Sequence, residues 1–385
     1  MIVIAPDKFK GSLSARAIAA VVAEQFRIVD SDVTVHEAPI ADGGEGTVDL
    51  MLDHGADLVQ VEVRGPLGEP VIAKYARRNG TAVLEVSSAD GLFQLRQQAD
   101  NRTALSASAF GVGELILDAV EGGADSLVIG LGGSASTDGG AGLASALGAR
   151  LTSATDAAPP WGGAGLEQLA NVDLDPLREV LRPIDLVLAT DVDNPLLEPS
   201  GAAAIYGPQK GADGDTVRLL ERGLAHWASL LLTHTNVDVR SVPGAGAAGG
   251  AGFPLLAAAN AQIQPGVDVL MALTAFEKRL EGATLMIVGK GSLDRQSLWG
   301  KGPVGAARLA RSMGIGVVAI VGVNTLSRDE LDDAAIDRVY AMTDIESDLS
   351  TCMENTNEIL AQLAHNLAFD EMRRPARRLT TRDDV

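Results

Sequence analysis

The feature that most constrains the fold is a repeated alternation of short aliphatic runs with alanine-rich segments of helical period. The aliphatic runs are residues 2–4, 33–35, 127–129, 186–188, 285–288 and 317–320. The segments of helical period include residues 14–26, 113–120 and 304–313. Apolar strands that alternate with helices are typical of βαβ units around a buried parallel sheet, so an α/β fold is expected. Many of the runs lead directly into loops rich in Gly and Asp, and ligands bind outside the carboxyl ends of the strands in such sheets.

The chain is long enough for two domains, since it has 385 residues of which 46% are hydrophobic. Gly and Pro punctuate residues 64–70, and a more strand-like, alternating stretch follows at 71–85. This change predicts a crossing into a second domain. At the other end, residues 373–385 carry five arginines without apolar periodicity, which predicts a disordered tail.

Charge and cysteine content exclude several classes of function. Acidic residues outnumber basic ones by 51 to 31, and a net charge of -20 argues against partners such as nucleic acid or an anionic membrane. The single cysteine, Cys352, cannot form an intramolecular disulfide, and no Cys/His spacing resembles a zinc site. The N-terminus has no signal-peptide pattern and no apolar stretch reaches 18 residues, so a cytoplasmic location is expected.

Three glycine-rich stretches match nucleotide-binding patterns only superficially. Residues 244–249 fit the dinucleotide fingerprint, but Pro243 precedes them in place of a clear strand. Residues 130–135 do follow a strand, yet both stretches lack the acidic residue expected about 20 positions downstream. The pair 300–301 resembles a P-loop, but Gly302 replaces the hydroxyl residue that would hold magnesium. A dinucleotide-dependent oxidoreductase is therefore the weakest of the alternatives.

Five other clusters combine acids with glycine, hydroxyls or lysines. They are residues 5–12, 41–47, 132–140, 190–195 and 289–296, the last followed by 300–303. Phosphoryl transfer needs this inventory: a carboxylate for magnesium, cations and backbone amides for phosphate oxygens, and a carboxylate for the hydroxyl proton. Each cluster alone is as consistent with a charged turn or a helix cap as with a site. Together they exceed what folding a sheet requires, and they favour a kinase.

The motifs and their order resemble the bacterial glycerate kinase family. The matching stretches are APDKFKGSLSA (5–15), PIADGGEGT (39–47), GVGELI (111–116), GGSASTDGG (132–140), DVDNPL (191–196), GPQKGA (207–212), PGAGAAGGAG (243–252) and DRQSLWGKGPVG (294–305). They extend over roughly residues 2–325 and leave out the arginine-rich tail.

The resemblance implies a two-domain α/β fold, in which a flavodoxin-like parallel-sheet domain carries a second α/β domain inserted into it. The expected boundaries are 1–64 plus 283–366 for the flavodoxin-like domain and 65–282 for the insertion. It also implies phosphorylation of D-glycerate with ATP and Mg²⁺, commonly to 2-phosphoglycerate. A homodimer is left open.

The resemblance further implies a set of site residues. Within that set we expect Asp191 to be the general base, because it ends an apolar strand and has Asp193 beside it. Asp193 and Lys8 complete the expected catalytic positions, and Asp294 and Asp191 are the expected metal ligands. The positions expected to bind substrate or nucleotide are Asp7, Lys10, Asp42, Glu45, Ser134, Asp138, Asn194, Lys210, Lys290 and Lys301.

Two positions depart from the family pattern. Family members usually have Gly-Glu-Gly where this chain has Lys290 between two glycines, and usually Ala-Thr-Asn-Asp at 135–138. The first change reverses a charge, so a glutamate that contacted a metal could not be replaced there without consequence. The alternative is therefore a homologue of reduced activity that binds an acidic metabolite or phosphorylates a related hydroxy acid.

Overall fold

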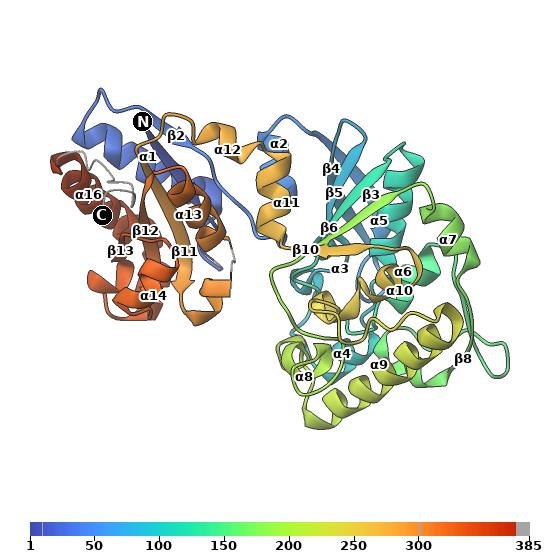
Figure 1. Cartoon of the computed structure of the whole chain (residues 1–385). Helices are drawn as coiled ribbons and strands as arrows, with labels where there is room; N and C mark the ends of the chain where they lie inside the picture. Colours follow the sequence, from blue (N-terminus) through green and yellow to red (C-terminus); the bar gives the residue numbers. More distant parts are fainter. Residues whose placement is uncertain (10, 300–301, 375–385) are drawn as a thin grey trace, which may run out of the picture. The chain divides into compact units, whose positions relative to one another are not determined.

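The computed structural model describes residues 1–9, 11–299 and 302–374, which divide into two compact units (Figure 1). The first unit contains Met1–Asp42 and the chain from Val267 onward, and the second contains Gly43–Gly266. The second unit is therefore inserted into the first, after its second strand.

The unit boundaries differ from the expected positions at 64 and 282. Strand β3 (Asp57–Arg64) pairs antiparallel along its whole length with β4 (Pro70–Arg78), so it belongs to the inserted unit. The glycines and prolines near 65–70 form the turn of this hairpin, closed by a 2.6 Å hydrogen bond from the Gly65 N–H to the Glu69 carbonyl. After the insertion, Phe276 and Leu280 pack in the core of the first unit.

The first unit is built on a parallel sheet with the strand order β13-β12-β11-β1-β2 among the described residues. The strands are β1 (Ile2–Pro6), β2 (Val35–Glu37), β11 (Leu285–Leu293), β12 (Gly316–Asn324) and β13 (Arg338–Ala341). Counted along this unit, the spatial order is 2-1-3-4-5, which is the flavodoxin-like order. The direction in which strands are added reverses between β1 and β11, and this is the topological switch point.

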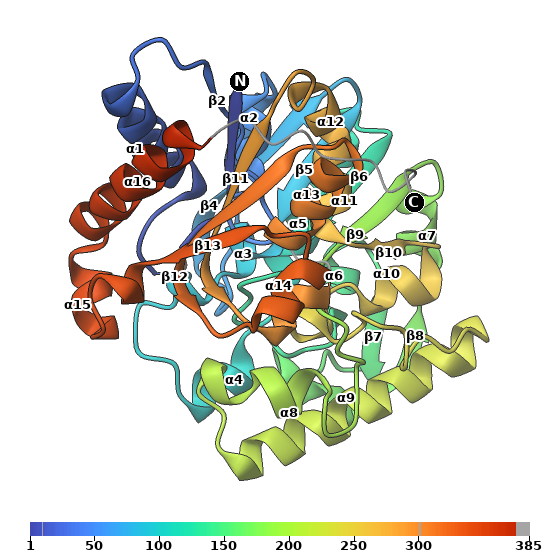
Figure 2. The same cartoon turned by 60° about the vertical axis from the view of Figure 1, so that its left-hand side comes forward.

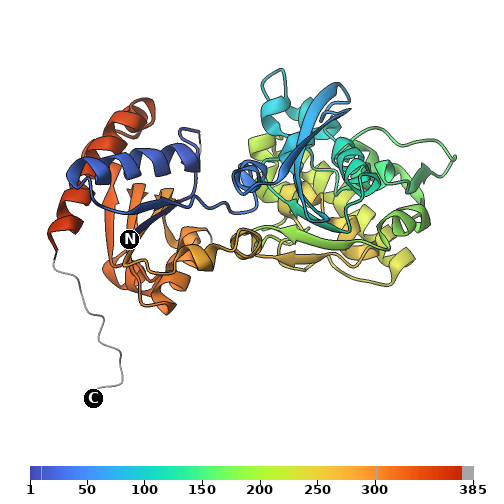
Figure 3. The ribbon, with the colours of Figure 1, turned by 90° about the horizontal axis from the view of Figure 1, so that it is seen from above.

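Helices cover both faces of this sheet (Figures 2 and 3). Successive strand residues face opposite sides, so Ile4 packs in one core with α1 and α16, whereas Val3 packs in the other with α13. One α-helix precedes the insertion, and the others begin at its end or later in the described chain. They are α1 (Ala15–Val29), α11 (Gly266–Leu273), α12 (Phe276–Arg279), α13 (Pro303–Ser312), α14 (Arg328–Asp333), α15 (Leu349–Glu354) and α16 (Thr356–Arg373). A disordered tail was expected from residue 373, but Arg373 is the last residue of α16. Residues 375–385 of the expected tail lie outside the described part of the chain.

The second unit contains a mixed sheet with the order β10-β9-β6-β5-β4-β3 in the described chain. Strands β5 (Thr81–Glu85), β6 (Ser126–Gly130), β9 (Asp185–Ala189) and β10 (Gln262–Gln264) run parallel, and the β3–β4 hairpin adds antiparallel strands. A separate antiparallel pair is formed by β7 (Arg150–Ser153) and β8 (Leu169–Asp173), and the 3₁₀ helix Gly163–Gln168 lies between them in the chain.

Helices pack on both faces of the mixed sheet as well. The Tyr75 hydroxyl lies 3.0 Å from Asp118 of α5, whereas the adjacent Lys74 contacts Asp49 of α2 on the opposite face. The α-helices of this unit are α2 (Thr47–Asp53), α3 (Val86–Asp90), α4 (Asn101–Ser106), α5 (Phe110–Glu121), α6 (Ala141–Ala146), α7 (Asp175–Leu181), α8 (Ala202–Tyr206), α9 (Gly214–Thr235) and α10 (Phe253–Ala258). No helix within the described ranges is both long and apolar enough to cross a bilayer.

Candidate functional site

The switch point of the first unit gathers charged groups at the carboxyl ends of β1 and β11. The Asp7 N–H donates to the Gly289 carbonyl at 2.9 Å, which continues the pairing of the two strands by one residue. One carboxylate oxygen of Asp7 accepts the Lys8 N–H at 2.7 Å, and the other lies 3.8 Å from Lys290 Nζ. Because ligands bind at such switch points, these side chains form the first candidate cluster.

Asp7 is held in an environment that favours its protonated form. Its side chain is buried, with 3% of the residue exposed. Burial, and after it the negative charge of Asp42, raise the pKa of Asp7 to about 6, while Lys290 and Lys8 oppose the rise. A carboxylate that titrates near neutral pH is suited to accepting a proton in a reaction.

The second unit brings together loops that follow β5, β6 and β9. A side-chain carbon at Gly130 would lie 2.1 Å from the Gly43 carbonyl oxygen, and one at Gly43 would lie 2.9 Å from that of Ala189. Only glycine permits this approach. Further along, the Gly139 N–H donates to the Gly249 carbonyl at 3.1 Å, so the stretch 243–252 also packs against the loop at 132–140.

The loop at 132–140 is supported from within the unit by Lys210. This lysine is 2% exposed, and its Nζ donates to Ser134 Oγ at 2.8 Å and to the Ser136 carbonyl. Ser136 in turn donates to Asp90 through its N–H at 3.1 Å and through its Oγ at 2.5 Å. Burial raises the pKa of Asp90 and lowers that of Lys210, each to about 8, although the opposite charges of the two groups counteract both changes.

Asp138 fixes the far end of the same loop. One carboxylate oxygen accepts from Ser108 Oγ at 2.9 Å, the Ala109 N–H at 3.0 Å and the Gly142 N–H at 3.2 Å. The other accepts from the Gly140 N–H at 3.0 Å. Protein groups therefore meet the side chains of Asp138 and Lys210 and shape the loop, and the expectation that the two residues contact a ligand stays a prediction.

The loop after β9 carries the residues expected to be catalytic. Asp191 accepts the Gly266 N–H at 2.8 Å, at the start of α11. The Asn194 side chain is used on both sides, since it donates to the Ser200 carbonyl at 2.7 Å and accepts from the Tyr206 hydroxyl at 2.5 Å. Asp193 is exposed, and its charge adds to burial in raising the pKa of Tyr206.

Comparison with known proteins decides the family. The sequence profile described as "Glycerate kinase family" matches residues 2–370. The chain belongs to the glycerate kinase family.

Characterised relatives extend over nearly the whole molecule. A protein named glycerate kinase from Halalkalibacterium halodurans is 38% identical over 371 residues, covering 95% of this chain and 97% of the relative. One named glycerate 2-kinase from Escherichia coli has the same identity and coverage. A crystal structure from Salmonella typhimurium LT2, named glycerate kinase 2, is 37% identical with a TM-score of 0.79 and covers 96% of this chain and 98% of that one. The family assignment makes the chain a phosphotransferase with an alcohol acceptor.

Within this glycerate kinase fold, the expected site residues fall on both units. Asp7, Lys8, Asp42, Lys290 and Asp294 belong to the first unit. Glu45, Ser134, Asp138, Asp191, Asp193, Asn194 and Lys210 belong to the second. Lys10 and Lys301 lie outside the described residues.

The expected metal ligands are committed to local hydrogen bonds. Asp294 accepts from the Ser297 N–H at 3.1 Å and Oγ at 3.2 Å, and so caps the 3₁₀ helix Arg295–Trp299. Asp191 lies in the other unit. In the described part of the chain, no group of three or more His, Cys, Asp or Glu side chains is arranged to hold a metal ion.

Sequence reasoning missed Asp90 and Glu85 of the segment after β5. Glu85 ends the strand and accepts the Val48 N–H at 2.7 Å, and Asp90 is fully buried beneath the loop at 132–140. Residues 85–90 carry the same signal, a strand end followed by acids and hydroxyls, but they contain no glycine, which four of the five selected clusters have.

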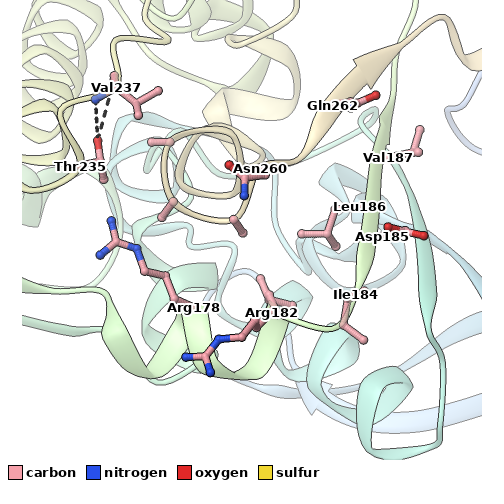
Figure 4. A pocket seen from close by; sticks show the side chains of 14 residues that line it. Arg178, Arg182, Ile184, Asp185, Leu186, Val187, Thr235, Val237, Asn260 and Gln262 are labelled. Carbon is pink, nitrogen blue, oxygen red and sulfur yellow. Dashed lines mark hydrogen bonds between the residues drawn. The ribbon is translucent and has the colours of Figure 1, made fainter.

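A cavity of about 860 Å³ lies at the edge of the second unit's sheet where its parallel strands begin (Figure 4). Asp185 and Gln262 line it, and they are the first residues of β9 and β10. Its arginines, Arg178 and Arg182, stand at the end of α7, where positive charge complements the helix dipole. Because this is the amino edge of the parallel strands, we assign the cavity no part in catalysis.

Proposed function

We propose that the protein transfers the γ-phosphoryl group of ATP to a hydroxyl of D-glycerate, with 2-phosphoglycerate as the product. Support for the acceptor and the product comes from the names of the relatives, glycerate kinase and glycerate 2-kinase, at 38% identity. The reaction is assigned to the cytoplasm, where ATP is available.

The observation that carries the proposal is the cluster at the switch point of the first unit. Asp7 is a buried carboxylate with a pKa of about 6, with the ammonium groups of Lys8 and Lys290 acting on it. In the proposed step, the hydroxyl oxygen of glycerate forms a bond to the γ-phosphorus while the bond to the bridging oxygen breaks. ADP leaves with that electron pair, and Asp7 takes the hydroxyl proton. The lysines bind the carboxylate of glycerate or the transferred phosphoryl group.

Asp191 is the second candidate for the base, with Asp193 beside it. Each carboxylate accepts one backbone N–H, Asp7 from Lys8 at 2.7 Å and Asp191 from Gly266 at 2.8 Å. The argument for Asp7 is stronger because burial raises its pKa toward the working range of a general base.

The loop at 132–140 is proposed to bind phosphate oxygens. Gly133 is exposed at its tip, while Lys210 and Asp138 hold the loop from the buried side. Backbone amides fixed in such a turn act as preorganised donors, which cost no reorganisation when charge develops on the phosphate.

Magnesium is proposed to enter with ATP. Mg²⁺ in kinases is commonly held by phosphate oxygens with one or two carboxylates, so a cage of three protein ligands is not required. Asp42 fits this role best among the carboxylates of the first unit, because its charge acts on Asp7 at the end of β1. Bound there, the ion would supply charge neutralisation for the phosphates.

The test is phosphorus NMR of incubations with ATP and magnesium, with D-glycerate or L-glycerate as acceptor. A 2-phosphoglycerate resonance that appears with D-glycerate is the expected result. The same incubations with Lys290→Glu examine the charge that differs from the family pattern.

The outcomes separate an active enzyme from a degenerate one. Turnover by Lys290→Glu alone would identify the natural chain as a homologue that has lost activity, in which Lys290, 3.8 Å from Asp7, replaces a required acid. Turnover by neither protein would contradict the kinase proposal itself.

A further inference from the structure

We propose that a cavity of about 270 Å³ on the second unit binds the nucleoside portion of ATP. The inference rests on the proposed kinase function and assigns one part of its nucleotide to a place. The cavity lies at the carboxyl end of β5, beside α2 and the 3₁₀ helix Leu92–Gln94. Its volume is below the usual range for drug-sized ligands, which suits a small group such as a base with its ribose.

Two exposed apolar side chains stand at the cavity. Phe93 is 69% exposed and Ile72 is 62% exposed, and both line it. A single exposed apolar side chain needs no explanation, but two around one polar cavity mark a place where an apolar surface is to be covered. Phe93 offers a flat aromatic face, and a nucleic-acid base stacks favourably on such a face.

An unsatisfied acceptor also lines the cavity. Gln94 donates its side-chain N–H to the Ser88 carbonyl at 2.6 Å, which fixes the orientation of the amide. Its Oε1 is buried and has no hydrogen-bond partner among the described residues. Because a buried carbonyl oxygen without a donor is costly, the structure favours a ligand that brings an N–H group, such as the amino group of adenine.

The negative charge of the cavity disfavours the anionic groups of the substrates. Glu45 and Glu85 both line it, and Lys74 Nζ is paired with Asp49 at 2.5 Å. Two further carboxylates disfavour phosphate and the carboxylate of glycerate.

One segment that lines the cavity is bonded to the loop proposed to bind phosphates. The Leu92 N–H donates to the Gly133 carbonyl at 2.9 Å, and Gly91 forms a bridge with Ser134. The segment that carries Phe93 and Gln94 is thereby fixed to the loop at 132–140. A nucleoside in the cavity would place its phosphates toward that loop.

The test uses calorimetric titration of the full-length protein with ADP and with inorganic tripolyphosphate. Phe93→Ala should weaken ADP binding about tenfold through lost stacking, and should leave tripolyphosphate, which has no base, within twofold of its original affinity. The matched control is Phe369→Ala, an exposed phenylalanine on α16 of the first unit, which should change neither affinity.

Gln94→Leu tests the acceptor. The natural protein should bind ADP more tightly than inosine diphosphate, which has a carbonyl in place of the amino group, and the variant should lose most of this preference. Circular dichroism of each variant confirms that it is folded.

The outcomes distinguish this inference from the kinase proposal. If the protein phosphorylates D-glycerate but Phe93→Ala leaves ADP binding unchanged, the cavity assignment is overturned and the kinase proposal remains intact. The same conclusion follows if Phe93→Ala weakens the binding of ADP and of tripolyphosphate equally. Absence of turnover combined with a selective loss of ADP binding would support the cavity and contradict the activity.

Discussion

The molecule contains two lysine–aspartate systems that differ in how completely they are satisfied. In the second unit, Lys210 and Asp90 are buried and are linked through Ser136, with donors and acceptors met by protein groups. In the first unit, Lys290 is 22% exposed and its Nζ lies 3.8 Å from Asp7, beyond hydrogen-bond distance. Both lie at the carboxyl ends of parallel strands, so position alone does not separate them.

The difference suggests a structural role for the Lys210–Asp90 pair and a role in the reaction for the Lys290–Asp7 pair. A satisfied buried network fixes one conformation of a loop, because any rearrangement leaves a charge without a partner. The looser pair can change its protonation state or exchange a partner for a substrate at smaller cost. Under the proposed mechanism, Lys210 of the second unit supports a binding loop and Lys290 of the first unit is available to the reacting groups.

Asp7→Asn should produce the largest effect on activity. Loss of the proton acceptor should lower kcat about 10²- to 10⁴-fold in an assay of ADP release.

The free energy of unfolding of Asp7→Asn should not be lower than that of the natural protein. Because the folded protein holds the Asp7 proton up to a pKa of about 6, against 3.8 in the unfolded chain, its stability declines as pH rises between these values. The variant lacks this decline and should be more stable above pH 6 by up to about 3 kcal/mol in urea unfolding.

The control is a carboxylate at the opposite edge of the same sheet. Asp337 accepts the Val317 N–H at 2.8 Å and pairs with Arg311 at 2.8 Å, at the start of β12. Asp337→Asn should cost stability and leave turnover unchanged. Equal losses of turnover in the two variants would contradict a chemical role for Asp7.

Lys210→Met should produce the largest loss of stability. The Ser134 hydroxyl and the Ser136 carbonyl would lose their buried Lys210 donor, which costs about 1–3 kcal/mol for each group in urea unfolding. Asp90→Asn acts on the same network through Ser136, so the loss in the double variant should be smaller than the sum of the two single losses. Additive losses in the double variant would show that the two groups do not form one network.

Most of the first unit could be predicted from its sequence. The runs at 2–4, 285–288 and 317–320 are strands, and residues 14–26 fall in α1, because buried parallel strands and amphipathic helices have distinct local patterns. The boundary at 64 was wrong because a hairpin turn and a domain linker are punctuated by the same residues.

The candidate site was predictable only in part. Asp7 and Lys290 were selected because each follows an apolar strand, and the structure brings them together through the pairing of β1 with β11. Asp138 was selected by the same signal and Lys210 through the family resemblance, yet their side chains point into the protein. Local sequence shows that a polar residue follows a strand, but whether it faces a ligand or supports a loop depends on contacts with segments distant in the chain.

Lys290→Met should produce a smaller effect that depends on pH. The Lys290 charge lowers the pKa of Asp7, so removing it should raise that pKa above about 6 and move the acidic limb of the kcat/KM profile to higher pH. The loss of activity should therefore be several-fold larger at pH 6 than at pH 8, where Asp7 is ionised in both proteins. Lys278→Met, which removes an exposed lysine of α12, should leave the profile in place. If the acidic limb of the kcat/KM profile stays at the same pH in Lys290→Met, Asp7 is not the group whose ionisation limits the reaction. The proposed difference between Lys290 and Lys210 would then be contradicted.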